Sequence, residues 1–413
     1  MTTGSWLTAK RLRAHGILLA VALWSLYIWT IATPGLRDRN SNLKGTDFLH
    51  FYTLGSQAIE YRTADLYDIN AQARVAAERV PEAAGIRYLP LYPPQVSLLF
   101  IPFAHLSYEG ALVLWWFCNS VVYALCCFVV WRLCPNLKAH GLTVLILAAG
   151  YPAFFHVIAW GQTSALALAC FTVFFVLVRQ RRDLIAGLAL GCLVFKPQLG
   201  VAAAVLFLAI GARKIVLGAS LSALLEMSIG VLYYGVEPLR AWFRTLWNVR
   251  TLSAMLEPRP YQTHCLRTFW SMLIPWSAVS TALYVISAIV LIAWTIKVWK
   301  SSVAWPHRFS LLLLATVLVS PHLTVYDLVI VAPAILFLSD WLIAQPNTKQ
   351  THLMGTLLYL VYFLPLIGPF ARWTHVQPSV VAMGVLAYLI TRTIGSREHQ
   401  TIGIPATTET IRT

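Results

Sequence analysis

The chain has 413 residues, of which 58% are hydrophobic and 11% are charged, with 31 Lys and Arg against 16 Asp and Glu. A soluble domain of this size cannot bury so much apolar surface. The composition therefore excludes a soluble globular protein and predicts an all-α polytopic membrane protein. Most of the net charge of +15 lies beside short loops on one side of the predicted bundle, as the positive-inside rule describes, so we do not predict nucleic-acid binding.

Apolar segments of crossing or near-crossing length follow one another along the chain, since a bilayer needs about 20 apolar residues per crossing helix. About twelve are predicted, near residues 14–33, 109–132, 140–158, 162–178, 184–195, 197–212, 215–234, 275–296, 308–321, 323–342, 351–370 and 376–392. The first is too long and too aromatic for a signal peptide, so we expect it to be retained. The short segments within 184–212 are either two crossings or a re-entrant pair.

Basic residues flank the short loops on one side and are nearly absent from those on the other. We therefore expect both termini in the cytoplasm, with the long loops 34–108 and 235–274 on the outer face. Residues 1–395 form one integral membrane domain in this interpretation. Residues 396–413 are polar and threonine-rich, which predicts a disordered cytoplasmic tail.

The first outer loop predicts two helices that lie at the membrane interface. One covers residues 47–62 and places Asp47 and His50 on one face, and the other covers 69–79 with Asp68 as its N-cap. Asp47 is a carboxylate between a crossing segment and aromatic residues, a position that suggests chemistry at the bilayer surface. The alternative, in which Asp47 only caps its helix, stays open at this point.

Three polar motifs interrupt the apolar segments and are predicted on the same face as Asp47. They are Trp160-Gly161-Gln162-Thr163, Phe195-Lys196-Pro197-Gln198 and Ser320-Pro321-His322-Leu323-Thr324-Val325-Tyr326-Asp327. Irregular backbone is tolerated at membrane depth only where it lines a cavity or is buried in protein, so we expect the motifs to converge. Lys196 either meets a phosphate, pairs with a structural carboxylate or extends its ammonium to the membrane interface. Gln162 and His322 either contact substrate or satisfy the local structure.

The second outer loop is rich in arginine, with Arg267 among several, and contains only Glu237 and Glu257 as acids. Guanidinium groups at the headgroup layer suit contact with a phosphate or with anionic lipid.

Taken together, these motifs resemble glycosyltransferase family 87, the polyprenol-phosphate-mannose-dependent α-mannosyltransferases of the GT-C architecture. The resemblance rests on Gly45-Thr46-Asp47-Phe48 with Phe51-Tyr52, then Tyr92-Pro93-Pro94, Gly161-Gln162, Lys196-Pro197, and Ser320-Pro321 with Tyr326-Asp327. It covers residues 45–335 in order. The family pattern often has Asn two positions after the Gln, where this chain has Ser164.

The resemblance implies an inverting hexosyltransferase in the cell inner membrane, with its active site facing outward. The sugar, mannose by resemblance, would move from a polyprenyl-phosphate donor to a lipid or glycan acceptor. Asp47 would be the general base, kept ionised by its place at a helix start. The expected substrate-binding residues are His50, Tyr52, Tyr92, Gln162, Lys196, Arg267, His322 and Asp327. No metal or other cofactor is expected, and membrane lipids are the remaining partners.

A transporter or flippase for lipids or lipid-linked sugars is the main alternative, because broken helices and a lysine at membrane depth also suit transport. The two halves of the sequence show no internal repeat, and the long loops are predicted on one face only, which favours an enzyme. A non-catalytic scaffold is the third interpretation, but it leaves the grouping of Asp47, Gln162, Lys196 and His322 without a purpose.

Overall fold

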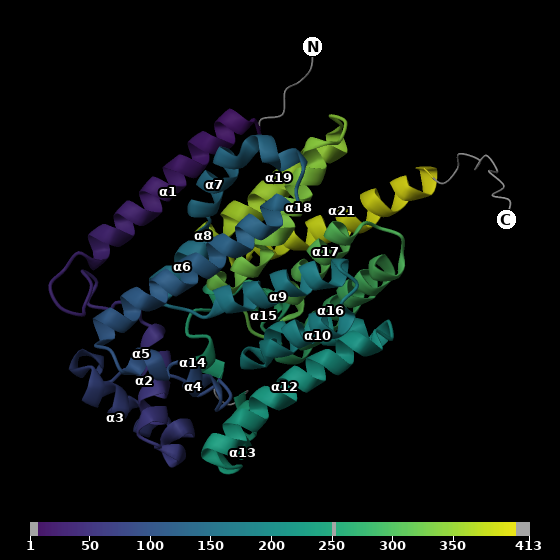
Figure 1. Cartoon of the computed structure of the whole chain (residues 1–413). Helices are drawn as coiled ribbons and strands as arrows, with labels where there is room; N and C mark the ends of the chain where they lie inside the picture. Colours follow the sequence, from purple (N-terminus) through teal and green to yellow (C-terminus); the bar gives the residue numbers. More distant parts are fainter. Residues whose placement is uncertain (1–6, 250–252, 402–413) are drawn as a thin grey trace.

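The computed structural model describes residues 7–249 and 253–401, and the regular elements in these ranges are all helices (Figure 1). Six of them are long and apolar enough to cross a membrane: α1 (Ala9–Ile31), α6 (Tyr108–Arg132), α12 (Arg213–Tyr234), α16 (Ser277–Lys300), η8 with α18 (Val325–Ile343), and α19 with η9 and α20 (Lys349–Thr374). A seventh candidate is the pair Asn136–Ala149 and Pro152–Trp160, bent by 42° at the junction of α7 (Gly141–Ala149) and α8 (Pro152–Trp160). The all-α polytopic prediction is confirmed.

The predicted number of about twelve crossings is not confirmed, because several apolar segments form helices too short to traverse a bilayer core of about 30 Å. The short apolar helices are α9 (Ser164–Arg179), α10 with η4 (Asp183–Phe195), α17 (Trp305–Val319) and the Pro378–Arg392 part of α21. The predicted pair within 184–212 forms α10–η4 and α11 (Val201–Ala209), with a break at Lys196 between them.

The helix α17 lies at the centre of the bundle. Every residue from Phe309 to Val319 is buried, and most of them are aliphatic. A helix that is apolar all round and buried is typical of a membrane-protein core. The helices α1, α6, α12 and α16 instead keep many large hydrophobic side chains exposed, as expected for surfaces that face lipid.

The first long loop folds into a small helical layer at one end of the bundle (Figure 1). It contains α2 (Phe48–Ile59), α3 (Ile69–Arg79), α4 (Val96–Leu99) and α5 (Ile101–Ala104), and α13 (Glu237–Trp247) and α14 (Ser253–Leu256) lie at the same end. We call this the loop end; both chain termini lie at the opposite end.

Two expectations for these segments need correction. The helix α2 does not lie on a surface with one exposed face, because every residue from Phe48 to Ala58 is buried, packed by α3, α4 and α5. Its apolar periodicity reflected contacts with protein on all sides. At the other end of the chain, α21 (Pro378–Thr401) continues into the predicted tail 396–413, and residues 402–413 of that tail lie outside the described residues.

Candidate active site

The segment that carries Asp47 is fixed by hydrogen bonds with three other parts of the chain. The amide of Asp47 donates to the carbonyl of Trp160 at 3.0 Å, which joins the start of α2 to the end of α8. The hydroxyl of Tyr88 donates to the carbonyl of Thr46, and the hydroxyl of Tyr108 donates to the carbonyl of Lys44 at 2.8 Å. These bonds hold the Asp47 backbone in one position relative to α6 and α8.

A glycine allows this close junction. Gly161 ends α8 in the left-handed region at φ 70°, and a Cβ built there would lie 2.5 Å from Cβ of Phe48. Both the backbone angle and the contact exclude a larger residue, since side chains disfavour positive φ and no Cβ tolerates such an approach. The glycine before Gln162 thus brings the end of α8 against the start of α2.

The side chain of Asp47 does not cap its helix. Asp47 occupies the N-cap position of α2, but its carboxylate accepts no hydrogen bond from the first turn. Oδ2 instead accepts from Nε2 of Gln162 at 2.6 Å. Asp68, at the start of α3, shows the contrast: its Oδ1 accepts from the amides of Asn70 and Ala71 at 2.8 and 3.0 Å, as predicted for a cap. The capping interpretation of Asp47 is therefore wrong.

Behind Gln162 lies a buried polar network that joins the three motifs. Nζ of Lys196 donates to Oε1 of Gln162 at 3.3 Å, to Oγ of Ser164 at 3.0 Å and to Oδ1 of Asp327 at 2.8 Å. Ser164 also donates to Oδ1 of Asp327 at 2.6 Å. All four of these side chains are at most 5% exposed. The predicted convergence of the breaks is confirmed for these residues, which come from α8–α9, the α10–α11 break and η8.

Lys196 is held by a structural carboxylate in this arrangement. Besides the ion pair with Asp327, its ammonium lies 5.0 Å from the centre of the Tyr326 ring. The other oxygen of Asp327 is near the amide and hydroxyl of Thr324, at 3.4 and 3.5 Å, where it completes a capping box at the start of η8. Both oxygens of Asp327 therefore have hydrogen-bond partners. Asp47 differs, because within the described residues its Oδ1 accepts no hydrogen bond.

Burial raises the pKa of Asp47 to about 6. The hydrogen bond from Gln162 and the charge of Lys196 lower the pKa in part, and the charge of Asp327 adds to the rise. The helix dipole was expected to keep Asp47 ionised, but burial has the larger effect on its pKa and raises it. A carboxylate with this pKa is mostly ionised at pH 7 and accepts a proton more readily than an ordinary aspartate, which suits a general base. Asp47 as a whole is half-buried, whereas the network residues behind it are buried.

Aromatic side chains of the first loop form a wall beside Asp47. The ring of His50 lies 5.2 Å from that of Tyr88 and 5.7 Å from that of Tyr92. Burial lowers the pKa of His50 to about 4, so its ring is neutral at pH 7. Burial also raises the pKa of Tyr92, and the nearby charge of Lys196 opposes that rise. Tyr52 lies apart from this wall, packed on Phe48 and Tyr108 with its hydroxyl donating to the carbonyl of Leu106 at 2.8 Å.

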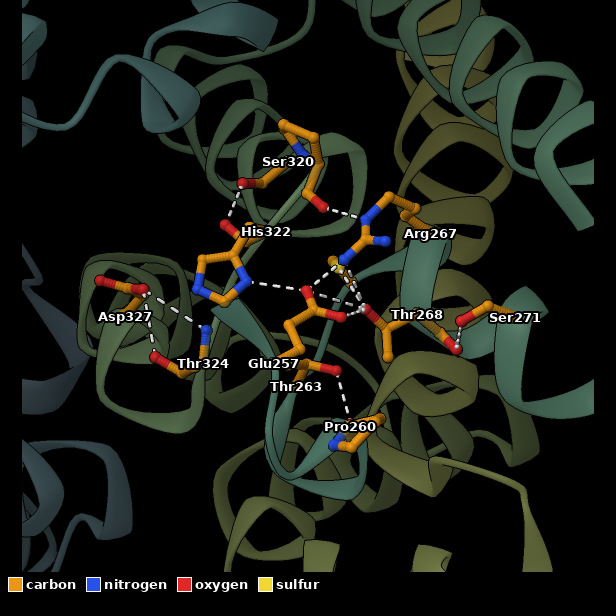
Figure 2. Close-up of polar contacts among 12 residues, drawn as sticks. Glu257, Pro260, Thr263, Arg267, Thr268, Ser271, Ser320, His322, Thr324 and Asp327 are labelled. Carbon is orange, nitrogen blue, oxygen red and sulfur yellow. Dashed lines mark hydrogen bonds and ion pairs between the residues drawn. The ribbon is translucent and has the colours of Figure 1, made fainter. Parts of the chain in front are cut away.

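Arg267 and His322 meet in a second cluster around Glu257 (Figure 2). Nδ1 of His322 lies 2.7 Å from Oε1 of Glu257, and Arg267 forms an ion pair with the same carboxylate. Glu257 is not among the site residues that the sequence predicts. The available signal was its position as one of only two acids in an arginine-rich loop.

A cavity with a volume of about 540 Å³ lies elsewhere in the bundle. It opens between α1, α6, α7, α18 and α19, and residues such as Leu12, Val144 and Leu336 line it. None of the network residues around Asp47 lines it, so its size does not make it the site of chemistry.

The sequence model of glycosyltransferase family 87 matches residues 91–321. The matched segment includes Gln162, Lys196, Glu257 and Arg267, whereas Asp47, His322 and Asp327 lie outside it. Neither the curated proteins nor the solved structures contain a significant match to this chain.

Proposed function

We propose, since the chain belongs to glycosyltransferase family 87, that it moves a sugar from a polyprenyl-phosphate donor to a hydroxyl of a lipid or glycan acceptor. Membership of the family makes the protein a glycosyltransferase. The proposed sugar is mannose, and the proposed general base is Asp47. The observation that carries this assignment is the Asp47 carboxylate, which has one oxygen without a hydrogen bond in the described residues, has a raised pKa and is free of a capping role.

The reaction we propose is a single displacement. The acceptor oxygen forms a bond to the anomeric carbon while the bond from that carbon to the phosphate oxygen breaks, which inverts the anomeric configuration. The proton of the acceptor hydroxyl passes to Oδ1 of Asp47, and the bonding electrons leave with the polyprenyl phosphate. One base is sufficient, because no covalent glycosyl-enzyme intermediate has to form.

The residues behind Asp47 suit this step. Gln162 fixes one oxygen of the carboxylate and leaves the other for the acceptor. Lys196 forms an ion pair with Asp327, so we propose that it positions the network and balances its charge and does not bind the substrate phosphate. The leaving phosphate would then contact His322 and Arg267 in the neighbouring cluster, and Tyr92 would contact the substrate from the aromatic wall.

We place the active site on the outer face of the cell inner membrane, with both termini in the cytoplasm. The support is the distribution of basic residues along the sequence, together with the location of both termini opposite the loop end. In this orientation Asp47 lies at the loop end, near the headgroup layer where a lipid-linked donor presents its phosphate. No metal is part of the proposed step, so transfer should persist in EDTA.

The test supplies purified protein with a membrane lipid extract and a radiolabelled donor, either polyprenyl-phosphate-mannose or a nucleotide-linked mannose. Label in a new product from the polyprenyl donor alone supports the proposal. Transfer from the nucleotide donor would refute the assigned donor class. If neither donor is consumed while the protein moves labelled lipid across sealed vesicles, the transporter alternative replaces the proposed enzyme.

A further inference from the structure

Glu257 is a nearly buried carboxylate in the arginine-rich second loop, and it is bound by three different side chains. It forms an ion pair with Arg267, lies 2.7 Å from Nδ1 of His322 and accepts from the hydroxyl of Thr268 at 3.2 Å. Burial alone would raise the pKa of Glu257, but the hydrogen bond from His322 and the charge of Arg267 outweigh burial and hold the pKa below its ordinary value. The carboxylate is therefore ionised at neutral pH.

Glu257 and its partners belong to three segments of the chain. Glu257 follows α14, whereas Arg267 and Thr268 begin α15 (Leu266–Leu273). His322 belongs to the turn before η8 (Val325–Val331), and Arg267 also donates to the carbonyl of Pro321 in that turn. The same two segments pair through their backbones, with the amide of His264 donating to the carbonyl of Leu323 at 3.0 Å. Glu257 thus joins the second loop to the turn that carries His322.

The contact with Glu257 decides which nitrogen of His322 faces the site. An ionised carboxylate only accepts hydrogen bonds, so Nδ1 must carry a proton whether the ring is neutral or charged. Nε2 is then the nitrogen that Glu257 leaves for another partner. In Figure 2, Nε2 points away from Glu257, toward the side on which Thr324 and Asp327 lie. Asp327 belongs to the network that contains Lys196 and, through Gln162, Asp47.

We propose that Glu257 is a positioning residue that accepts from Nδ1 of His322, so that the doubly protonated ring donates from Nε2 to the phosphate oxygen of the departing polyprenyl phosphate. The inference rests on the proposed function and adds Glu257 to it. Glu257 touches no substrate and acts only through His322. Arg267 neutralises the carboxylate of Glu257. With His322 protonated, the cluster therefore carries one net positive charge, which attracts the phosphate.

The competing explanation is that Glu257 merely clamps the loop through Arg267. The two explanations predict different results for a variant in which His322 is already replaced.

The variant Glu257→Gln keeps the size of the side chain, but its amide accepts from or donates to Nδ1, so the tautomer of His322 is no longer fixed. We expect Glu257→Gln to lower kcat by about tenfold or more, a part of the roughly 100- to 1,000-fold that one oxyanion donor contributes, with the acceptor KM unchanged.

The experiment is a double-mutant cycle on sugar transfer with Glu257→Gln, His322→Gln and the double variant. If Glu257 acts through His322, the double variant is no slower than His322→Gln alone. Additive losses would overturn the inference and leave the clamp. Glu237→Gln is the matched control, because Glu237 lies in the same loop but is exposed and pairs with Arg244. We expect it to transfer at the wild-type rate.

A second measurement is independent of activity. ¹⁵N spectra of histidine-labelled protein, with the His322 signals assigned by their loss in His322→Gln, report which nitrogen is protonated in the neutral ring. We expect Nδ1 to be protonated in the wild type and a mixture of tautomers in Glu257→Gln. An unprotonated Nδ1 in the wild type would overturn the inference. Absence of sugar transfer by the wild type would instead refute the proposed function. The spectra would still show whether Glu257 fixes the tautomer of His322.

Discussion

Replacing Asp47 by Asn removes the proposed base while preserving almost everything around it. The carbonyl oxygen of the introduced asparagine can still accept from Nε2 of Gln162, which lies 2.6 Å from Oδ2 in the wild type. The backbone bond to Trp160 is unaffected, and no cap is lost because the carboxylate does not cap α2. The amide cannot take a proton from the acceptor, so the variant isolates the chemical step from the fold.

The expected loss follows from the role of the group. A positioned general base contributes about 100- to 10,000-fold to a rate, so kcat should fall by that factor. This corresponds to about 3–5 kcal/mol of activation free energy, at about 1.4 kcal/mol for each tenfold change. The wild-type kcat/KM should rise with pH through about 6 and then level off, because Asp47 must be ionised to act and its pKa is about 6.

Asp47→Asn should raise the thermal stability of the protein at neutral pH, although it lowers the rate of transfer. The folded-state pKa of Asp47 lies above its ordinary value of 3.8, so the folded protein binds the proton more tightly than the unfolded chain. The wild type therefore loses stability as pH rises from about 4 to about 6, and Asp47→Asn removes that loss. The variant should unfold at a higher temperature than the wild type at pH 7, with the difference vanishing toward pH 4.

The assay is sugar transfer from the labelled polyprenyl donor, with Asp68→Asn as the matched control. Asp68 also stands at a helix start in the first loop, but its carboxylate caps α3, a task that Asn performs equally well. The control should retain wild-type activity. Equal transfer by Asp47→Asn and the wild type, or a pH profile without a rise near 6, would refute the role assigned to Asp47.

Three further predictions concern the residues around the base. Gln162→Leu removes a hydrogen bond that lowers the pKa of Asp47, so the rise of kcat/KM should move to higher pH in a pH–rate profile; an unchanged profile would contradict this. Lys196→Met leaves Asp327 buried without its partner and should cost about 3–5 kcal/mol of stability, seen as a lower thermal midpoint. Lys196→Met/Asp327→Asn should recover much of that loss, and a single variant as stable as the wild type would argue against the pair. Gly161→Ala should reduce both the midpoint and transfer, because its Cβ would lie 2.5 Å from Phe48; Gly85→Ala, at φ 86° with nothing near its Cβ, should show only the smaller effect of backbone strain.

Several features of the protein follow from local sequence alone. Length and apolar content predicted the all-α membrane class, because long continuous apolar runs satisfy their backbone hydrogen bonds in lipid as helices. Polar breaks at Gln162, Lys196 and Asp327 predicted a convergent site, because the cost of burying these groups demands partners. The cap of α3 by Asp68 was predictable for a similar reason, since the donors and the acceptor lie within three residues.

Local pattern was insufficient where a contact depends on distant parts of the chain. The periodicity of α2 cannot distinguish lipid from protein, so its complete burial was not predicted. The length of an apolar run likewise does not say whether a helix continues, which is why the predicted number of crossings is not confirmed. In the site, the choice between a phosphate and a carboxylate for Lys196 was open in the sequence.

Tertiary structure made that choice by placing Asp327, 131 residues away, at 2.8 Å from the ammonium. It also brought Glu257 to His322 across 65 residues and turned the Asp47 carboxylate from its own helix to Gln162, 115 residues away. The sequence by itself determined which polar groups must find partners in the membrane, because desolvation penalises each of them wherever it lies. Only the packing of the helices decided which groups meet, because hydrogen bonds and ion pairs act over a few ångströms and the chain order does not specify those distances.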